Sequence, residues 1–169
     1  LSGQTLEAFL NAVSHFDLFA VGLNCSLGAE ELRPHLEELS EKAPFPVIAY
    51  PNAGLPDQFG QYTQSPDEMA RHVKDFLENG YLNLVGGCCG TTPDHIRKFV
   101  ELSDHAKPRE VPRKKHELRL SGLEPLTIFN GSNFINIGER TNVSGSRKFA
   151  RLIKEEQYEE SLSVARQLV

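Results

Sequence analysis

Three cysteines carry the most specific chemistry that this sequence offers. They are Cys25 and the adjacent pair Cys88 and Cys89, which has glycines on both sides. Alternate side chains of a regular strand point to opposite faces, so the pair can reach one ion only where the backbone bends, and glycines permit such a bend. Three thiolates can hold Zn²⁺ and leave its fourth tetrahedral position open to a substrate. The cysteines therefore predict a catalytic zinc site rather than a structural one.

Two other interpretations of the cysteines stay open on spacing alone. Free cysteines often behave as small buried hydrophobic residues, and a separated cysteine plus an adjacent pair matches no general metal-binding spacing. A redox pair is less favoured, because oxidised adjacent cysteines close a strained ring and C-x-x-C is the usual spacing for thiol exchange.

The cysteines fall where predicted strands end. Apolar runs typical of buried strands occupy residues 17–26, 45–54 and 81–89. Helical patterns occupy residues 5–13, 28–43, 65–80 and 91–102. This alternation predicts an α/β fold with a parallel sheet, either open or closed into a barrel. Cys25, Asn52 and the cysteine pair would then share the rim formed by the carboxyl ends of the strands, where such folds bind ligands.

Local signals set the expected helix boundaries. Ser65 followed by Pro66 and Glu68 predicts an N-cap with a capping box. Pro34 is expected in the first turn of its helix, because an interior proline removes a backbone hydrogen bond. None of the six histidines stands at ligand spacing from a cysteine, so none is assigned to the site.

The composition restricts the possible partners. The 169 residues carry a net charge of −5, which argues against an extended phosphate-binding surface, and no nucleic-acid partner is expected. No apolar run approaches the roughly 20 residues of a membrane span, and the first residues lack a signal pattern. An odd number of cysteines fits reduced thiols or a metal site better than disulfides. We therefore expect a cytoplasmic protein with no membrane partner.

The pattern changes after residue 106. Residues 107–132 mix proline, charged and turn residues, which predicts an interdomain linker. Its basic run at 109–115 is expected to be solvated, and a phosphate contact is the alternative. Residues 133–169 resume a strand pattern and then one or two helical patterns, which predicts the beginning of a second α/β unit.

A resemblance to a known family covers essentially the whole chain. The segments GLNCSLGAEEL, YPNAGLPDQFGQY and VGGCCGTTPDHI resemble the homocysteine-binding domain of cobalamin-dependent methionine synthases. The segments SGLEPL and FINIGERTNVSGSRKFARLIKEEQYEESLSVARQLV resemble the start of the methyltetrahydrofolate-binding domain that follows it. The cysteine motif is shared with other homocysteine S-methyltransferases, whereas GERTNVSGS is specific to the folate- and cobalamin-using enzymes.

This resemblance implies two (β/α)8 barrels. Residues 1–106 would be the last three strand–helix units of a homocysteine-binding barrel, residues 107–132 the linker, and residues 133–169 the start of a pterin-binding barrel. It also implies that the chain is a fragment, inactive alone, whose cobalamin domain lies elsewhere in the same full-length chain.

The chemistry implied by the resemblance is two methyl transfers. 5-Methyltetrahydrofolate would methylate cob(I)alamin, and methylcobalamin would methylate homocysteine, giving methionine and tetrahydrofolate. Zn²⁺ held by Cys25, Cys88 and Cys89 would displace the proton of the homocysteine thiol, because only the thiolate is a useful nucleophile. Three thiolate ligands would keep the substrate sulfur electron-rich.

Three further residues enter through the resemblance. The amide oxygen of Asn52 would fill the fourth zinc position until homocysteine arrives, and an ordinary turn is the alternative for its P-N-A-G segment. Glu139 and Asn142 would lie near N5 of the pterin, which must gain a proton to leave. For Glu139, a salt bridge with Arg140 or Arg147 is the alternative.

Overall fold

The computed structural model describes residues 3–113, 116–135 and 141–166. Its contacts divide the chain into two compact units, Leu1–Thr127 and Ile128–Val169.

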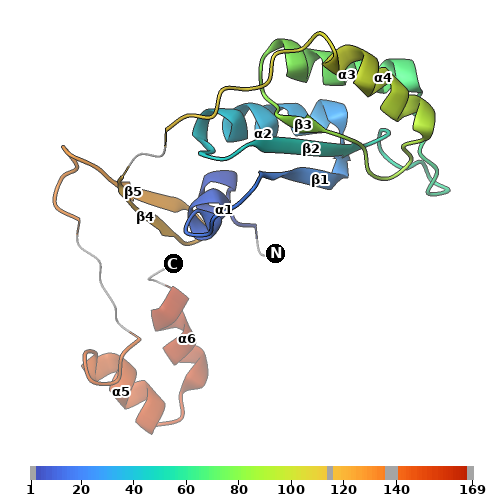
Figure 1. The fold of residues 1–169 in the computed structure, drawn as a ribbon. Coiled ribbons are helices and arrows are strands. Elements are labelled where there is room, and N and C mark those ends of the chain that lie inside the picture. Colours follow the sequence, from blue (N-terminus) through green and yellow to red (C-terminus); the bar gives the residue numbers. More distant parts are fainter. Residues whose placement is uncertain (1–2, 114–115, 136–140, 167–169) are drawn as a thin grey trace. The chain divides into compact units, whose positions relative to one another are not determined.

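The first unit is built around a three-stranded parallel sheet in the order β1-β2-β3 (Figure 1). Its elements in chain order are α1 Leu6–Val13, β1 Val21–Gly28, α2 Ala29–Lys42, β2 Val47–Asn52, α3 Pro66–Glu78, β3 Leu84–Val85, α4 Pro93–Ser103, β4 Leu118–Ser121 and β5 Pro125–Ile128. The helices α2, α3 and α4 lie on the same side of the sheet (Figure 1). The predicted parallel α/β fold is confirmed, and three strands with covering helices are compatible with part of a barrel.

The core of this unit joins the sheet to its helices. Leu32, Leu36 and Leu39 of α2 are buried against Val47 and Ala49 of β2. A second cluster consists of Ala53, Met69, Val73 and Phe99, which come from the end of β2, α3 and α4. Both clusters pack the helices against the strands and the strand ends.

Helix α3 begins as its sequence predicts. The backbone N–H of Glu68 donates to the Ser65 hydroxyl, and the Glu68 carboxylate accepts from the Ser65 backbone N–H at 2.8 Å. Pro66 occupies the first turn, where its missing N–H has no intrahelical partner to lose. The predicted capping box is therefore confirmed.

Helix α2 differs from its prediction. It begins at Ala29, so Pro34 lies inside the helix rather than in its first turn. Proline cannot donate to the carbonyl four residues before it, so one internal hydrogen bond of α2 is missing. The apolar face of α2, with Leu32 and Leu36 fully covered, offsets this loss through packing.

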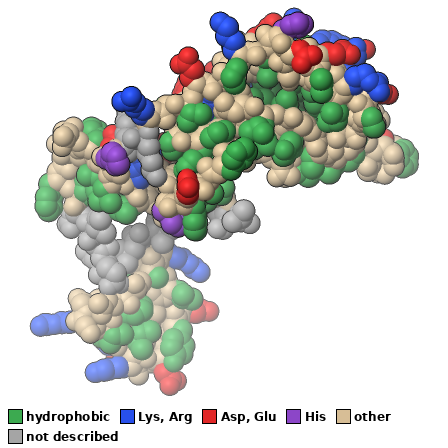
Figure 2. Space-filling view, in the orientation of Figure 1, with side chains coloured by type: hydrophobic (Ala, Val, Ile, Leu, Met, Phe, Trp, Pro, Cys, Tyr) green, Lys and Arg blue, Asp and Glu red, His purple; other side chains and the backbone are tan. Residues whose placement is uncertain are grey.

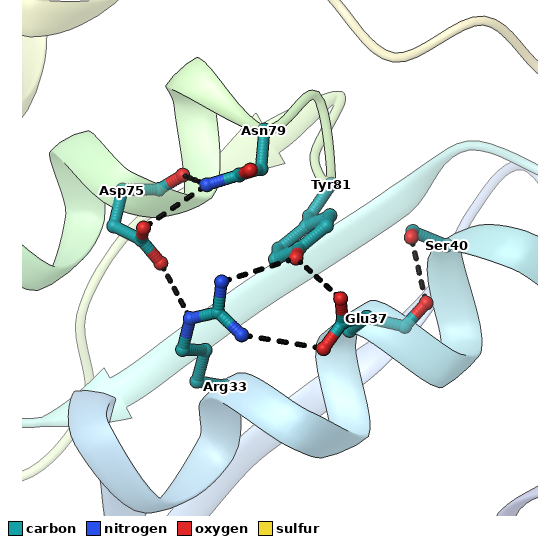
Figure 3. A network of polar contacts seen from close by, with 6 residues as sticks. All are labelled: Arg33, Glu37, Ser40, Asp75, Asn79 and Tyr81. Atoms are coloured by element: carbon teal, nitrogen blue, oxygen red, sulfur yellow. Dashed lines mark hydrogen bonds and ion pairs between the residues drawn. The ribbon is translucent and has the colours of Figure 1, made fainter.

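A polar network joins α2 to α3 on the outer side of the sheet (Figure 3). The Arg33 guanidinium donates to Asp75 at 2.7 Å and to Glu37 at 3.2 Å. The Tyr81 hydroxyl accepts from Arg33 at 3.2 Å and donates to Glu37 at 2.9 Å. The charged groups are about two-fifths exposed, so the network fixes helix orientation more than it adds stability.

The segment that follows α4 is more structured than its composition predicts. Arg109, expected to be solvated, is only 6% exposed. Its guanidinium donates to the backbone carbonyls of Ser40, Ala43 and Phe45 at distances between 2.6 and 3.0 Å. These carbonyls lie at and beyond the end of α2, where carbonyl oxygens have no helical N–H to accept from. Arg109 therefore supplies hydrogen-bond donors to these oxygens.

A β-hairpin, β4–β5, follows Arg109 and packs on α1. The Thr5 N–H donates to the Leu123 carbonyl at 3.0 Å, and the Gln4 side chain donates to the Gly122 carbonyl at 2.8 Å. The first unit thus extends into residues that the sequence assigns to a linker.

The second unit contains α5 Arg147–Lys154 and α6 Tyr158–Arg166. Leu152 and Val164 are buried, which confirms the predicted helical patterns as two helices. Half of residues 133–142, where a strand is expected, lie outside the described residues.

The surface in Figure 2 shows positive and negative side chains interspersed over the helices of the first unit. Within the described ranges, no helix combines the length and the apolar character that crossing a membrane requires.

Candidate metal centre

Cys25 is placed by an irregularity near the end of β1. Pairing with β2 is regular as far as Asn24 and resumes at Gly28, with more residues on β1 than on β2 between these two points. Within this bulge Cys25 and Ser26 have φ angles of 58° and 61°. Non-glycine residues rarely adopt this left-handed conformation, and bulges re-aim side chains at the ends of strands. The sequence predicts a backbone bend at the cysteine pair, and the structure has a bend at Cys25.

The cysteine pair is held against the end of β2 by backbone hydrogen bonds. The Cys88 N–H donates to the Pro51 carbonyl, and the Ala53 N–H donates to the Cys89 carbonyl, both at 2.9 Å. The Thr91 hydroxyl donates to the Cys88 carbonyl at 2.7 Å. Strand-like pairing thus continues beyond the two residues of β3 and fixes both thiols beside β2.

Gly90 allows the loop to turn immediately after the pair. Its φ of +78° is in the left-handed region, and a Cβ at this position would lie 2.2 Å from the Cβ of Tyr62. Glycine is therefore required here both by the backbone conformation and by the close approach of Tyr62.

The three sulfur atoms converge. The Cys25 and Cys89 Sγ atoms are 3.6 Å apart, the Cys88 and Cys89 Sγ atoms are 3.9 Å apart, and all three lie within 4.8 Å of one another. Zn–S bonds of about 2.3 Å in tetrahedral geometry separate two ligand sulfurs by about 3.8 Å. The arrangement and its soft donor set therefore fit a divalent cation such as Zn²⁺, and the three cysteines could hold a metal ion.

The half-buried thiols influence one another's ionisation. A hydrogen bond from the backbone of Ser26, followed by one from Cys89, lowers the pKa of Cys25. The hydrogen bond with Cys25 raises the pKa of Cys89, which therefore keeps its proton longer. Without a cation, Cys25 is thus the first of this pair to become a thiolate.

Asn52 lies between the cysteines. Its side chain is 2% exposed, and its Oδ1 accepts from the backbone N–H of Cys89 at 3.1 Å. A side-chain hydrogen bond from Asn52 also contributes to the lowered pKa of Cys25. The amide therefore connects the bulge of β1 to the turn that carries the pair.

Two further polar side chains approach the sulfurs, and sequence reasoning missed both. Asn24 Nδ2 lies 3.9 Å from Cys88 Sγ. The Tyr62 hydroxyl is close enough to Cys89 for their interaction to raise the pKa of Tyr62. The sequence signals that could have pointed to them are that Asn24 is a polar residue next to Cys25 and that Tyr62 is an aromatic residue in the long loop after β2.

The histidine nearest to this region has a structural role. His95 is 4% exposed, its Nδ1 accepts from the Thr92 N–H at 3.1 Å, and its Nε2 is 3.0 Å from the Gln64 carbonyl. His95 therefore links the start of α4 to the loop that precedes α3, and does not join the thiols.

Of the two residues expected near a pterin, the structure describes Asn142. Asn142 is exposed, its Oδ1 accepts from the Ser144 N–H at 2.8 Å, and its carbonyl accepts from the Ser146 N–H at 2.9 Å. Glu139 lies outside the described residues.

A comparison with protein families decides the broad class. The family model described as homocysteine S-methyltransferase matches residues 1–102. The chain belongs to the homocysteine S-methyltransferase family. The matched residues include Asn52 and all three cysteines, whereas residues 103–169 lie beyond the match.

Membership of the homocysteine S-methyltransferase family fits the geometry of the site. It indicates a methyltransferase that acts on homocysteine, and the three converging thiols could hold a metal ion. Three segments, which contain Cys25, Asn52 and the cysteine pair, predict a homocysteine-binding domain. The family match confirms this prediction for residues 1–102.

Proposed function

We propose that the chain supplies the zinc site of a cobalamin-dependent methionine synthase, in which a homocysteine thiolate accepts a methyl group from methylcobalamin. The observation that carries this proposal is the convergence of three cysteine sulfurs in a homocysteine S-methyltransferase chain. When bound, methylcobalamin would supply the methyl group and keep the electron pair of its carbon–cobalt bond, and the homocysteine sulfur would accept the methyl group through a lone pair. The thiol proton leaves before this step.

Cys25, Cys88 and Cys89 would be the protein ligands of the zinc ion. When bound, Zn²⁺ would coordinate the homocysteine sulfur and lower its pKa, so that the thiolate is present at neutral pH. The three cysteine thiolates contribute negative charge, which keeps electron density on the substrate sulfur. Their half-buried position leaves room for a substrate to approach.

Asn52 is proposed as the fourth ligand in the absence of homocysteine. Its support is its burial beside Cys25 and Cys89. The amide oxygen already accepts the Cys89 N–H, and a carbonyl oxygen has a second lone pair that remains available.

We further propose the domain arrangement that the resemblance implies. Residues 1–106 would end a (β/α)8 homocysteine-binding barrel, residues 107–132 would connect it, and residues 133–169 would begin a pterin-binding barrel. Within this proposal Glu139 and Asn142 contribute to the binding of 5-methyltetrahydrofolate, which regenerates methylcobalamin. The support for this half is the resemblance of GERTNVSGS and its surroundings.

A folate-independent homocysteine methyltransferase is the second candidate, because the family match covers only the homocysteine-binding part. Binding of 5-methyltetrahydrofolate to the full-length protein discriminates between the two. Loss of that binding in an Asn142→Ala variant supports the folate-dependent enzyme, and absence of binding to the unaltered protein favours the alternative.

Metal content tests the site itself. The purified chain should carry one equivalent of zinc by elemental analysis, and Cys25→Ser, Cys88→Ser and Cys89→Ser should each lose most of it, because two thiolates do not hold zinc firmly. Thr63→Ala, exposed on the neighbouring loop, is the matched control and should keep its zinc. Stoichiometric zinc retained in the three serine variants would contradict the proposal.

A further inference from the structure

The proposed function creates a selectivity problem at the thiols. Three cysteine sulfurs and the homocysteine sulfur would surround one cation and face the same electrophilic methyl donor. Thiolates are good nucleophiles, so a methyl group could be lost to a ligand cysteine instead of the substrate. Some property of the site has to make the protein sulfurs less reactive than the substrate sulfur.

Polar groups of the surrounding chain approach the cysteine sulfurs, and the contact with Cys88 is a hydrogen bond. Asn24 Nδ2 approaches Cys88 Sγ at 3.9 Å, which is within the range of a long N–H···S contact. Tyr62 packs against Gly90, the residue after Cys89, and its hydroxyl is close enough to Cys89 for their interaction to raise the pKa of Tyr62. Cys25 receives the backbone N–H of Ser26 and a bond from the side chain of Asn52.

Packing against Gly90 and the second core cluster sets the position of Tyr62. Its Cβ and Cγ lie against Gly90, where an added Cβ would come within 2.2 Å and 2.7 Å of them. Its ring also packs on the second core cluster, which includes Ala53. The loop that carries it is closed by the Asp57 carboxylate, which accepts the Gln61 N–H at 2.9 Å.

Asn24 is fixed by the strand that carries it. It is the last regularly paired residue of β1 before the bulge, so its side chain and the redirected Cys25 start from adjacent positions. The contact of Asn24 with Cys88 therefore crosses from β1 to the loop after β3, and Tyr62 reaches Cys89 from the loop after β2.

We propose that Asn24 and Tyr62 are positioning residues that reduce the nucleophilicity of the Cys88 and Cys89 sulfurs, so that the methyl group goes to homocysteine. A donated hydrogen bond occupies a sulfur lone pair and withdraws electron density from it, as hydrogen bonds around other metal-bound sulfurs do. In this proposal a homocysteine sulfur at the fourth position receives neither of these two contacts. This inference rests on the proposed function.

Selective alkylation of the zinc-loaded chain tests the idea. Iodoacetamide is the probe: a sulfur lone pair forms the new S–C bond, the C–I bond breaks, and iodide leaves. Rates are followed for each cysteine by peptide mass spectrometry at saturating zinc. Tyr62→Phe should speed alkylation of Cys89, and Asn24→Ala that of Cys88, each roughly threefold to tenfold over the unaltered chain, as expected for one lost hydrogen bond.

The control variant is Tyr50→Phe, which removes a hydroxyl from the same unit and should leave all three rates unchanged. Equal rates in the unaltered chain and the two test variants overturn the inference. So does a uniform rise at all three cysteines, which reports general opening, or loss of zinc from the variants, which reports a role in metal retention.

Zinc content measured on the same samples separates the two proposals. An unaltered chain without zinc overturns the proposed function and this inference together. A zinc-loaded chain whose variants show no cysteine-specific change overturns only the inference.

Discussion

Cys25 combines a strained backbone with a close approach to the sulfur of Cys89. A left-handed conformation in a non-glycine residue costs of order 1–3 kcal/mol and persists where the surrounding structure requires it. Here the strained residue brings its sulfur to 3.6 Å from that of Cys89. The free energy of metal binding would offset this cost, so the strain and the proposed zinc site support the same interpretation.

Arg109 has the largest predicted effect on stability of any single side chain discussed. Arg109→Ala removes three hydrogen bonds from the Arg109 guanidinium to the backbone carbonyls of Ser40, Ala43 and Phe45. We expect a loss of about 2–4 kcal/mol in the free energy of unfolding, because hydrogen bonds from a charged group are lost. Urea unfolding followed by far-UV circular dichroism measures it.

Arg113→Ala provides the control for this prediction. Arg113 belongs to the same basic run but is exposed, so its removal should change stability by less than about 0.5 kcal/mol. Similar losses in the two variants would show that charge, rather than the carbonyl contacts of Arg109, explains the effect.

The individual residues divide into those that the sequence could reveal and those that it could not. The cysteines and Asn52 were predictable, because parallel strands bring their carboxyl ends to one rim whatever the details of packing. Arg109 was not, because its acceptors lie far away in the sequence and a basic run looks the same whether it is solvated or buried. Asn24 and Tyr62 depend on side-chain distances that spacing does not encode.

Among the loops, Gly60 and Gly90 form a matched pair for measuring steric cost. Both have left-handed φ angles, of +76° and +78°, but a Cβ on Gly60 would meet nothing within 4 Å. Gly60→Ala should therefore cost only the conformational penalty of about 1–2 kcal/mol. Gly90→Ala should cost more and weaken zinc binding, because Tyr62 has to move.

Calorimetric binding of zinc to the two variants, together with their unfolding midpoints, checks this difference. Comparable zinc affinities for Gly60→Ala and Gly90→Ala would show that the loop tolerates the displacement, and the steric argument would then be wrong.

The start of α3 gives stability a specific dependence on pH. The hydrogen bond from the Ser65 hydroxyl, then that from the Ser65 backbone N–H, lowers the pKa of Glu68. A carboxyl group whose pKa is depressed by folding stabilises the protein above its unfolded pKa of about 4.3, and this contribution disappears as pH falls through the folded pKa. Ser65→Ala should therefore destabilise the protein near neutral pH and less so in acid.

Carbon-detected NMR titration provides the direct measurement. The pKa of Glu68 should rise in Ser65→Ala, whereas Ser144→Ala in the second unit should leave it unchanged. An unshifted Glu68 pKa in Ser65→Ala would show that the hydroxyl bond does not hold the carboxylate.

A helix or strand could be predicted from the sequence where the residues that determine it are close together in the chain. The start of α3 could be predicted, because Ser65, Pro66 and Glu68 lie next to one another in the sequence. The start of α2 could not, since tertiary packing of Leu32 and Leu36 overrides the penalty of Pro34. The hairpin β4–β5 was missed because its stability depends on contacts with α1.

At the scale of the molecule, the chemistry is concentrated in the first unit. The sheet, the bulge, both cysteine-bearing segments and the family match fall within residues 1–127. A parallel sheet is normally covered on both faces, and the described strands have helices on one side, which agrees with part of a barrel. The parallel order could be predicted from the repeated strand–helix pattern, whereas barrel closure depends on more strands than the described residues provide.

Zinc should stabilise this unit by mass action. A ligand that binds the folded form only adds about 2.7 kcal/mol at a free concentration 100 times its dissociation constant. Thermal unfolding of the unaltered chain should therefore shift to higher temperature with added zinc and to lower temperature with a chelator. Cys88→Ser should show the same midpoint under both conditions, because its remaining thiols hold zinc weakly. The Cys89 Sγ lies 3.6 Å from the Cys25 Sγ and 3.9 Å from the Cys88 Sγ. Identical midpoints for the unaltered chain with zinc and with chelator would mean that these three sulfurs do not bind the ion tightly enough to support the proposed chemistry.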